Sequence, residues 1–364
     1  MTVTWRAKAF AYLEMARPYT LFHAGTLCLA AGLVATDGRL SAGRAALIWL
    51  TPTVGWLAGL ATSDYHDRTL DRVEKPMRPI PSGRIGEREA FWLMIGLIAA
   101  GFFGALVLGW KTFALAWLVM ILGVAYARTF KAKGFLGHFD RGILAGLTVL
   151  FGSIAATGGI PPRMWWLVAL FFCHDSATNL LGAVRDMEGD RAAGYQTVPV
   201  RYGVAVAASI AGALMAAWVV IGLAFAVTTQ WQPLFAVLFA AAVVCDLLAL
   251  LQVAAAGRAE AAPADGEARS ERRVAALGAH KVLVVERLIL SVAFAATVWS
   301  PVKALSLLVV LAFATWWSQI RLRDRYEFVP LVPLQGDEPA GGRGRPSEEK
   351  GESRGHAGTS ARTA

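Results

Sequence analysis

Apolar stretches of about 20 residues recur along most of the 364-residue chain, and they constrain its fold more than any other feature. A helix of this length just spans the hydrocarbon core of a bilayer. Hydrophobic residues make up 56% of the sequence, whereas soluble domains contain roughly 45–50%. The pattern predicts an all-α integral membrane protein with nine to ten transmembrane helices. We place ten of them at about residues 18–36, 43–62, 90–109, 112–127, 141–159, 163–182, 204–228, 233–255, 282–299 and 302–320.

Lysine and arginine residues are concentrated in every second connection between these stretches. Basic loops remain on the cytoplasmic side of a membrane, so the distribution predicts a multi-pass protein of the cell (plasma) membrane with both termini in the cytoplasm. It also explains the net charge of +9 without nucleic-acid binding.

Composition divides the chain into three parts. Residues 1–16 read as a cytoplasmic N-terminal segment, 17–325 as the transmembrane domain, and 326–364 as a cytoplasmic tail. The tail is rich in Gly, Pro, Glu, Arg and Ser, and such a composition predicts disorder because it cannot bury a core.

Three carboxylates end the second apolar stretch, at Asp64, Asp67 and Asp71. Their spacing of i, i+3 and i+7 places them on one face of a helix. Like charges on one face repel, and a bound cation removes that repulsion. Mg²⁺ prefers oxygen ligands and commonly combines one or two carboxylates with substrate phosphates. The spacing therefore favours a magnesium site, although a single acidic run can also be a solvated helix face.

A second acidic cluster ends the sixth stretch, with Asp186 and Asp190 at i and i+4. The predicted topology puts both clusters on the cytoplasmic side, where two Mg²⁺ ions could hold one diphosphate between them. Basic side chains would neutralise the remaining phosphate charge. The candidates for this role are Arg68, Arg78, Lys131, Lys133, Arg185 and Arg201.

These two stretches resemble the signatures of the UbiA prenyltransferase superfamily. Residues 63–85 (SDYHDRTLDRVEKPMRPIPSGRI) are similar to the family's NDxxDxxxD motif and the loop that follows it, and residues 185–203 (RDMEGDRAAGYQTVPVRYG) to its DxxxD motif. The chain departs from the pattern at Ser63, which replaces the leading Asn, and in the count of ten helices where the family typically has nine.

The resemblance implies a helical bundle around a central cavity and a polyprenyl diphosphate donor bound through Mg²⁺. By the same resemblance Asp64, Asp67 and Asp71 would serve one metal and Asp186 and Asp190 the other. Arg68 and Lys131 match positions that contact diphosphate in the family.

The expected activity is transfer of a prenyl group from this donor to a lipophilic acceptor within the membrane. A terpene cyclase of the same family and, as a different class, a lipid transporter are the alternatives. A transporter is disfavoured because the carboxylates cluster at one membrane surface and not at the midplane. The acceptor stays open among an aromatic acid, a glycerol phosphate and another lipophilic nucleophile.

Some ionisable residues lie within the apolar stretches, where they are costly and often functional. His174 and Asp175 adjoin in the sixth stretch, and their side chains should diverge on a helix. A functional role and a structural hydrogen bond between helices both remain open for them. Glu286 and Arg287 read as an interfacial ion pair near the start of the ninth stretch.

Overall fold

The computed structural model describes residues 4–229, 232–258 and 266–323, and the predicted tail at 326–364 lies outside them. The described chain is almost entirely helical. Its helices are α1 (Trp5–Ala16), α2 (Pro18–Leu21), α3 (His23–Ala35), α4 (Ala42–His66), α5 (Arg68–Glu74), α6 (Glu87–Leu108), α7 (Trp110–Ala125), α8 (Phe135–Thr157), α9 (Met164–Ala192), α10 (Val198–Thr229), α11 (Pro233–Arg258), α12 (Gly266–Ala295) and α13 (Pro301–Ser318), with π-helical turns η1 (Tyr126–Phe130) and η3 (Gln319–Arg323).

Within the described residues, nine helical segments are long and apolar enough to cross a membrane. They correspond to nine of the ten predicted spans, so the predicted helical membrane fold is confirmed. The tenth, predicted at 282–299, is the C-terminal part of α12, a 30-residue helix that begins sixteen residues earlier, at Gly266. α12 is long enough to cross a membrane, but it contains too many charged residues to count among the nine apolar segments. It contacts α3, α9, α11 and α13 in the bundle.

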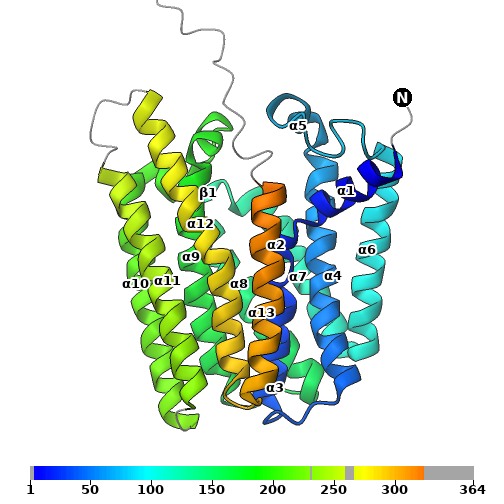
Figure 1. Cartoon of the computed structure of the whole chain (residues 1–364), viewed down its shortest axis with the longest axis vertical. Coiled ribbons are helices and arrows are strands. Elements are labelled where there is room, and N and C mark those ends of the chain that lie inside the picture. The colour runs from blue at the N-terminus through cyan, green and yellow to red at the C-terminus, as the bar shows by residue number, and fades with distance from the viewer. Residues whose placement is uncertain (1–3, 230–231, 259–265, 324–364) are drawn as a thin grey trace, which may run out of the picture. The chain divides into compact units, whose positions relative to one another are not determined.

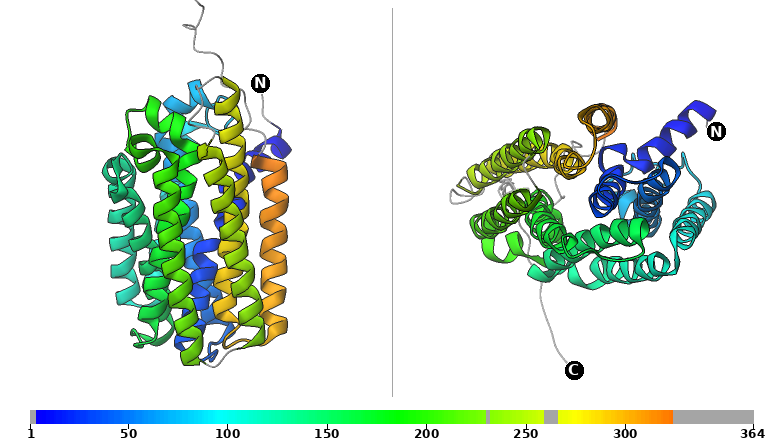
Figure 2. Two further views of the ribbon diagram at one scale, coloured as in Figure 1. Left: turned by 90° about the vertical axis from the view of Figure 1, so that its left-hand side faces the viewer. Right: turned by 90° about the horizontal axis from the view of Figure 1, so that it is seen from below.

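The long helices stand side by side along the long axis of the molecule (Figure 1). Seen along that axis, they form an oval in which α9, α10 and α11 lie on one side and α4 and α6 on the other (Figure 2). One end of the bundle carries the slanted helix α1, the short helix α5 and the strand β1 (Lys133–Gly134). This strand pairs in parallel with β2 (Gln196–Thr197), so it ties the segment before α8 to the segment after α9.

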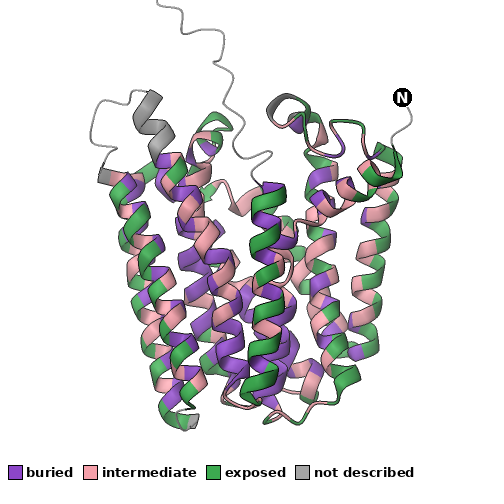
Figure 3. Cartoon of the chain, in the orientation of Figure 1, coloured by how far each residue is buried: buried purple, intermediate pink, exposed green. Residues whose placement is uncertain are grey.

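Burial follows the pattern of a bundle surrounded by lipid. Purple buried residues lie toward the interior of the bundle and green exposed residues on its outside (Figure 3). Large apolar side chains are exposed on the outer helices, for example Trp92 (61%), Phe103 (68%) and Trp110 (72%). In lipid this exposure is stable, because the surrounding chains are as apolar as the side chains.

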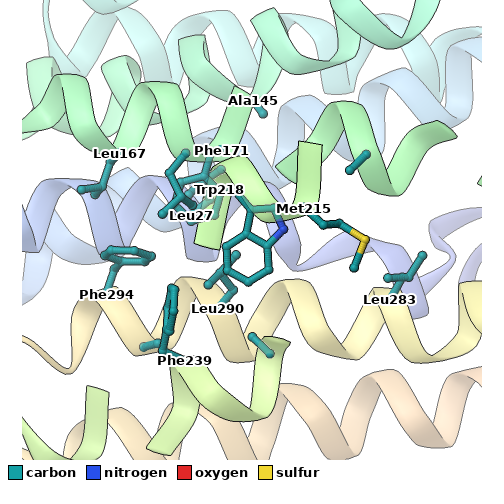
Figure 4. Close-up of a cluster of buried hydrophobic side chains, with 14 of the residues drawn as sticks. Leu27, Ala145, Leu167, Phe171, Met215, Trp218, Phe239, Leu283, Leu290 and Phe294 are labelled. Atoms are coloured by element: carbon teal, nitrogen blue, oxygen red, sulfur yellow. The ribbon is translucent and has the colours of Figure 1, made fainter. Parts of the chain in front are cut away.

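The largest apolar cluster joins α9, α10, α11 and α12, with Trp218 at its centre (Figure 4). The Trp218 ring lies edge to face against Phe239 at 5.4 Å and against His174 at 5.6 Å. Phe171 and Phe294 pack beside it at 5.7 Å from each other. These ring contacts pack α9 and α12 against α10 and α11. The polar residues described below lie on α9 and α12.

Candidate active site

A cavity of about 220 Å³ lies between α2, α3, α4, η1, α8, α9 and α12. Apolar and aromatic side chains line much of it, including Tyr19, Trp56, Leu283, Val284 and Leu288. The charged residues of its lining are Lys131, Arg141, Arg185, Asp186, Asp190 and Arg287. It therefore combines apolar walls with a few convergent polar groups, as small-molecule sites do.

The second acidic motif forms part of this lining. Asp190 is buried, and its carboxylate lies 3.6 Å from the ammonium of Lys131, which precedes β1. Asp186, one helical turn earlier, is half-exposed and accepts two hydrogen bonds from Arg185, at 2.7 and 2.8 Å. Burial lowers the pKa of Lys131, but the carboxylates of Asp190 and Asp186 outweigh burial and raise the pKa above its ordinary value. The ammonium is therefore charged at neutral pH.

The first acidic motif spans the junction of α4 and α5. Asp67 ends α4 and begins α5, and the backbone hydrogen bonds from Asp67 to Ser63 and from Asp71 to Asp67 continue the helical register across the junction. Asp64 and Asp71 are buried, whereas Asp67 and Ser63 are exposed. The three carboxylates therefore lie on successive turns of one continuous helical register.

Arginine side chains bind the two buried carboxylates of this motif. Arg78 donates to Asp71 at 2.6 Å and lies 3.6 Å from Asp64. Arg17, between α1 and α2, also donates to Asp64. Tyr19 and Thr20, directly after Arg17, line the cavity. The pairing therefore ties the first motif to the segment that lines the cavity, although its carboxylates are not part of the lining.

Both motifs lie at the end of the bundle that carries α5 and β1 (Figure 1). Lys75, which follows α5, lies within electrostatic range of Asp186 on α9. The donor set at each motif is made of carboxylate oxygens, the ligand type that Mg²⁺ prefers. Basic groups pair with Asp64, Asp71, Asp186 and Asp190, so the residues at this end of the bundle include carboxylates that fit divalent cations and basic groups that fit a diphosphate.

The other predicted phosphate-binding residues have different surroundings. Arg68 donates to Glu87 at 3.2 Å and to the carbonyl oxygen of Tyr65 at 2.7 Å. Lys133 on β1 and Arg201 on α10 are exposed. None of these three lines the cavity, so their assignment to diphosphate stays a prediction.

Deeper in the bundle, Asp175 binds two arginines from other helices. Its carboxylate lies 3.2 Å from Arg141 on α8 and 2.9 Å from Arg287 on α12. Arg287 also donates to Thr178 at 2.6 Å. The proposed ion pair between Glu286 and Arg287 is therefore wrong. The two side chains diverge on the helix, and Glu286 instead lies 2.9 Å from the imidazole of His174.

Several cavity residues were not among the predicted site residues, namely Arg141, His138, Asn179 and His23. Arg141 is the clearest of them from the sequence, because it stands at the start of the apolar stretch predicted at 141–159. Arg17, the partner of Asp64, was not among the predicted site residues either. Their contacts join segments far apart in the chain, which no local spacing indicates.

Known proteins resemble this chain in sequence. It is 35% identical over 199 residues to the digeranylgeranylglyceryl phosphate synthase of Korarchaeum cryptofilum, covering 54% of this chain and 69% of the relative. The synthase of the same name from Methanopyrus kandleri is 36% identical over 201 residues, covering 55% and 73%.

Solved structures show the same fold. A digeranylgeranylglyceryl phosphate synthase superposes with a TM-score of 0.59 at 22% identity, covering 80% of this chain and 98% of the other. A UbiA homologue from Archaeoglobus fulgidus, bound to DMAPP and Mg²⁺, superposes with a TM-score of 0.53 at 18% identity, covering 86% and 99%. The pattern of the UbiA prenyltransferase family matches residues 24–265, a span that includes both acidic motifs. The chain belongs to the UbiA prenyltransferase family.

Proposed function

We propose that this prenyltransferase moves a prenyl group from a polyprenyl diphosphate to a membrane-soluble acceptor, with two Mg²⁺ ions at the two acidic motifs. Asp64, Asp67 and Asp71 would hold one ion, and Asp186 and Asp190 the other. The observation that carries the proposal is the cavity itself. It has Asp186, Asp190, Lys131 and Arg185 in its lining together with apolar walls.

The basic residues would change partners when the donor binds. Lys131 and Arg185 now bind Asp190 and Asp186, and the same groups can donate to diphosphate oxygens once the carboxylates hold cations. Arg78, between Asp64 and Asp71, is placed for the same exchange. Charge-assisted hydrogen bonds of this type are strong and directional.

Departure of the diphosphate leaves an allylic cation at C1 of the prenyl chain. Bound Mg²⁺ supplies the Lewis acidity that stabilises the leaving group. Leu283, Val284 and Leu288 line the cavity on the α12 side, and apolar side chains exclude the water that would otherwise capture the cation. The acceptor nucleophile then attacks C1.

The acceptor we propose is a glyceryl phosphate lipid. The name of the relatives' product contains two geranylgeranyl groups on one glyceryl phosphate, so the matching acceptor is geranylgeranylglyceryl phosphate and the matching donor geranylgeranyl diphosphate. Arg141 and Arg287 line the cavity and share a single carboxylate, that of Asp175. This local excess of positive charge favours an anionic acceptor over a neutral one.

We place the protein in the cell membrane with the acidic motifs on the cytoplasmic side. The support is the concentration of lysine and arginine in the loops at that end. A water-soluble diphosphate headgroup can reach the motifs from that side while its prenyl chain stays in the membrane.

The proposal is tested with purified protein in lipid nanodiscs, geranylgeranyl diphosphate and geranylgeranylglyceryl phosphate. We expect transfer that requires Mg²⁺ and stops with EDTA. Asp190→Asn should lower turnover by on the order of 10²-fold or more, because metal ions contribute several kcal/mol of charge stabilisation. Asp37→Asn, at an exposed ion pair with Arg163, is the matched control and should transfer normally.

Analysis of the products separates the alternatives. A cyclic hydrocarbon or alcohol formed from the donor alone would identify a cyclase instead of a transferase. Full turnover of Asp190→Asn, or in the presence of EDTA, would contradict the metal assignment. Metal-independent movement of lipid across vesicles, without a product, would identify a transporter.

A further inference from the structure

His138 and Asn179 form a hydrogen-bonded pair that lines the cavity from two helices. The Nδ1 atom of His138, on α8, lies 2.7 Å from the Oδ1 atom of Asn179 on α9. Both residues belong to the lining. His138 is only 4% exposed, and its Nε2 atom is buried without a hydrogen-bond partner in the described part of the chain. A buried polar atom without a partner is uncommon, and a catalytic role, a bound water or an ion can account for it.

The contact with Asn179 determines which nitrogen of the imidazole carries the proton. A carboxamide oxygen can only accept, so Nδ1 must donate to it. Burial disfavours the charged imidazolium. The neutral ring therefore has its lone pair on Nε2, the atom without a partner. This arrangement, in which one nitrogen is oriented by a neighbour and the other is a free acceptor, is typical of a general base.

The other histidines of the cavity lack this arrangement. His280 accepts a hydrogen bond at Nδ1 from Arg323 at 3.0 Å. His23, on α3, has a buried Nδ1 without a partner, and no hydrogen bond within the described residues orients its ring. The other titratable and charged groups of the cavity lining are Tyr19 on α2, His23 on α3, Tyr126 on η1, Lys131 after it, Arg141 on α8, Arg185, Asp186 and Asp190 on α9, and His280 and Arg287 on α12. None of them is hydrogen-bonded to His138 in the described residues.

The position of the pair suits the reacting end of an acceptor. Asn179 precedes Asp186 by seven residues on α9, and at 1.5 Å per residue this is about 10 Å along the helix. A diphosphate bound at Asp186 would occupy the first part of that distance, and C1 of the prenyl chain would follow it. His138, which contacts Asn179, therefore lies deeper in the bundle than Asp186, at the depth where C1 of such a donor would lie.

We propose that His138 is the general base of the transfer and that Asn179 positions it. The inference rests on the proposed function, because it assigns the acceptor's nucleophile to a hydroxyl. In the step, the hydroxyl oxygen forms a bond to C1 after the bond from C1 to the diphosphate oxygen has broken. The electron pair of that bond leaves with the diphosphate, and the hydroxyl proton moves to Nε2 of His138.

The test is the pH dependence of transfer with geranylgeranyl diphosphate and geranylgeranylglyceryl phosphate. The wild-type rate should rise with pH, because Nε2 accepts a proton only in the neutral ring. His138→Gln should lose this acidic limb and lower kcat by on the order of 10²-fold or more. Its KM for the donor should change by less than about twofold, because the base acts only on the acceptor.

Two further variants distinguish a base from a structural histidine. Asn179→Asp should move the acidic limb to higher pH, because a carboxylate beside Nδ1 stabilises the imidazolium. His280→Gln should keep the limb where it is in the wild type. Thermal unfolding of each purified variant establishes that it is folded.

The inference is overturned if His138→Gln keeps the acidic limb or transfers within about threefold of the wild-type rate. Should the wild type not transfer to this acceptor at all, the proposed acceptor fails, and ¹⁵N NMR of the histidines in nanodiscs then decides the inference separately. An unprotonated Nε2 on His138 at neutral pH supports it, and a protonated Nε2 overturns it.

Discussion

Asp175 lies between guanidinium groups that belong to two other helices, and it is 2% exposed. Ionisable groups at membrane depth are costly unless they are paired, and here one carboxylate pairs with two arginines and leaves one positive charge in excess. Arg141 and Arg287 are themselves only 17% and 16% exposed. The pairing explains how three charged residues are tolerated next to an apolar cavity.

Replacing Asp175 with Asn should therefore destabilise the protein strongly. Removing one partner of a buried ion pair leaves an uncompensated charge and costs roughly 3–5 kcal/mol. The matched change Asp37→Asn, at a pair with Arg163 whose side chains are 51% and 34% exposed, should cost about 1 kcal/mol or less. Thermal unfolding of both variants in one detergent compares them, and equal shifts would argue against the pairing.

At the scale of helices, close packing in this bundle depends on small residues. On α8, a Cβ added at Gly152 would overlap the carbonyl oxygen of Cys28 on α3 and would lie 3.0 Å from the Cβ of Ala31. Small residues allow membrane helices to approach closely, because packing and not a hydrophobic driving force associates them. This contact fixes α3 against α8, and both helices contribute to the cavity.

Gly152→Ala should therefore lower stability by about 1–3 kcal/mol, the usual cost of overpacking. Gly96→Ala is the control, because a Cβ at Gly96 on α6 meets open space. In a helix interior that change should be neutral or stabilising by up to about 1 kcal/mol. Heat unfolding followed by circular dichroism would measure both, and a Gly152→Ala protein as stable as Gly96→Ala would show that α3 and α8 can separate at little cost.

For the whole molecule, the distribution of lysine and arginine predicts the orientation in the membrane. The end that carries the acidic motifs should face the cytoplasm. A cysteine at the exposed position Arg88, at the start of α6, should react with a membrane-impermeant maleimide only after cells are permeabilised. A cysteine at Gly43, at the start of α4, should react in intact cells. The unmodified chain measures background labelling, and the reverse pattern would overturn the orientation.

Much of the fold could be predicted because it depends on local properties of the chain. The length and composition of an apolar stretch determine whether it can span a bilayer, and nine such segments are found in the described residues. α12 was only partly recognised, because it buries residues such as Glu286 inside the bundle. Hydropathy alone cannot distinguish a polar residue that faces other helices from one that faces lipid.

The acidic motifs were likewise visible in the sequence, because carboxylates three or four residues apart share a helix face whatever surrounds them. Only the tertiary structure decided which groups meet those faces. Arg17 with Asp64 and His138 with Asn179 join positions 47 and 41 residues apart. Such pairs depend on how each helix is rotated about its axis. Packing against several neighbours sets that rotation, and no spacing within one helix records it.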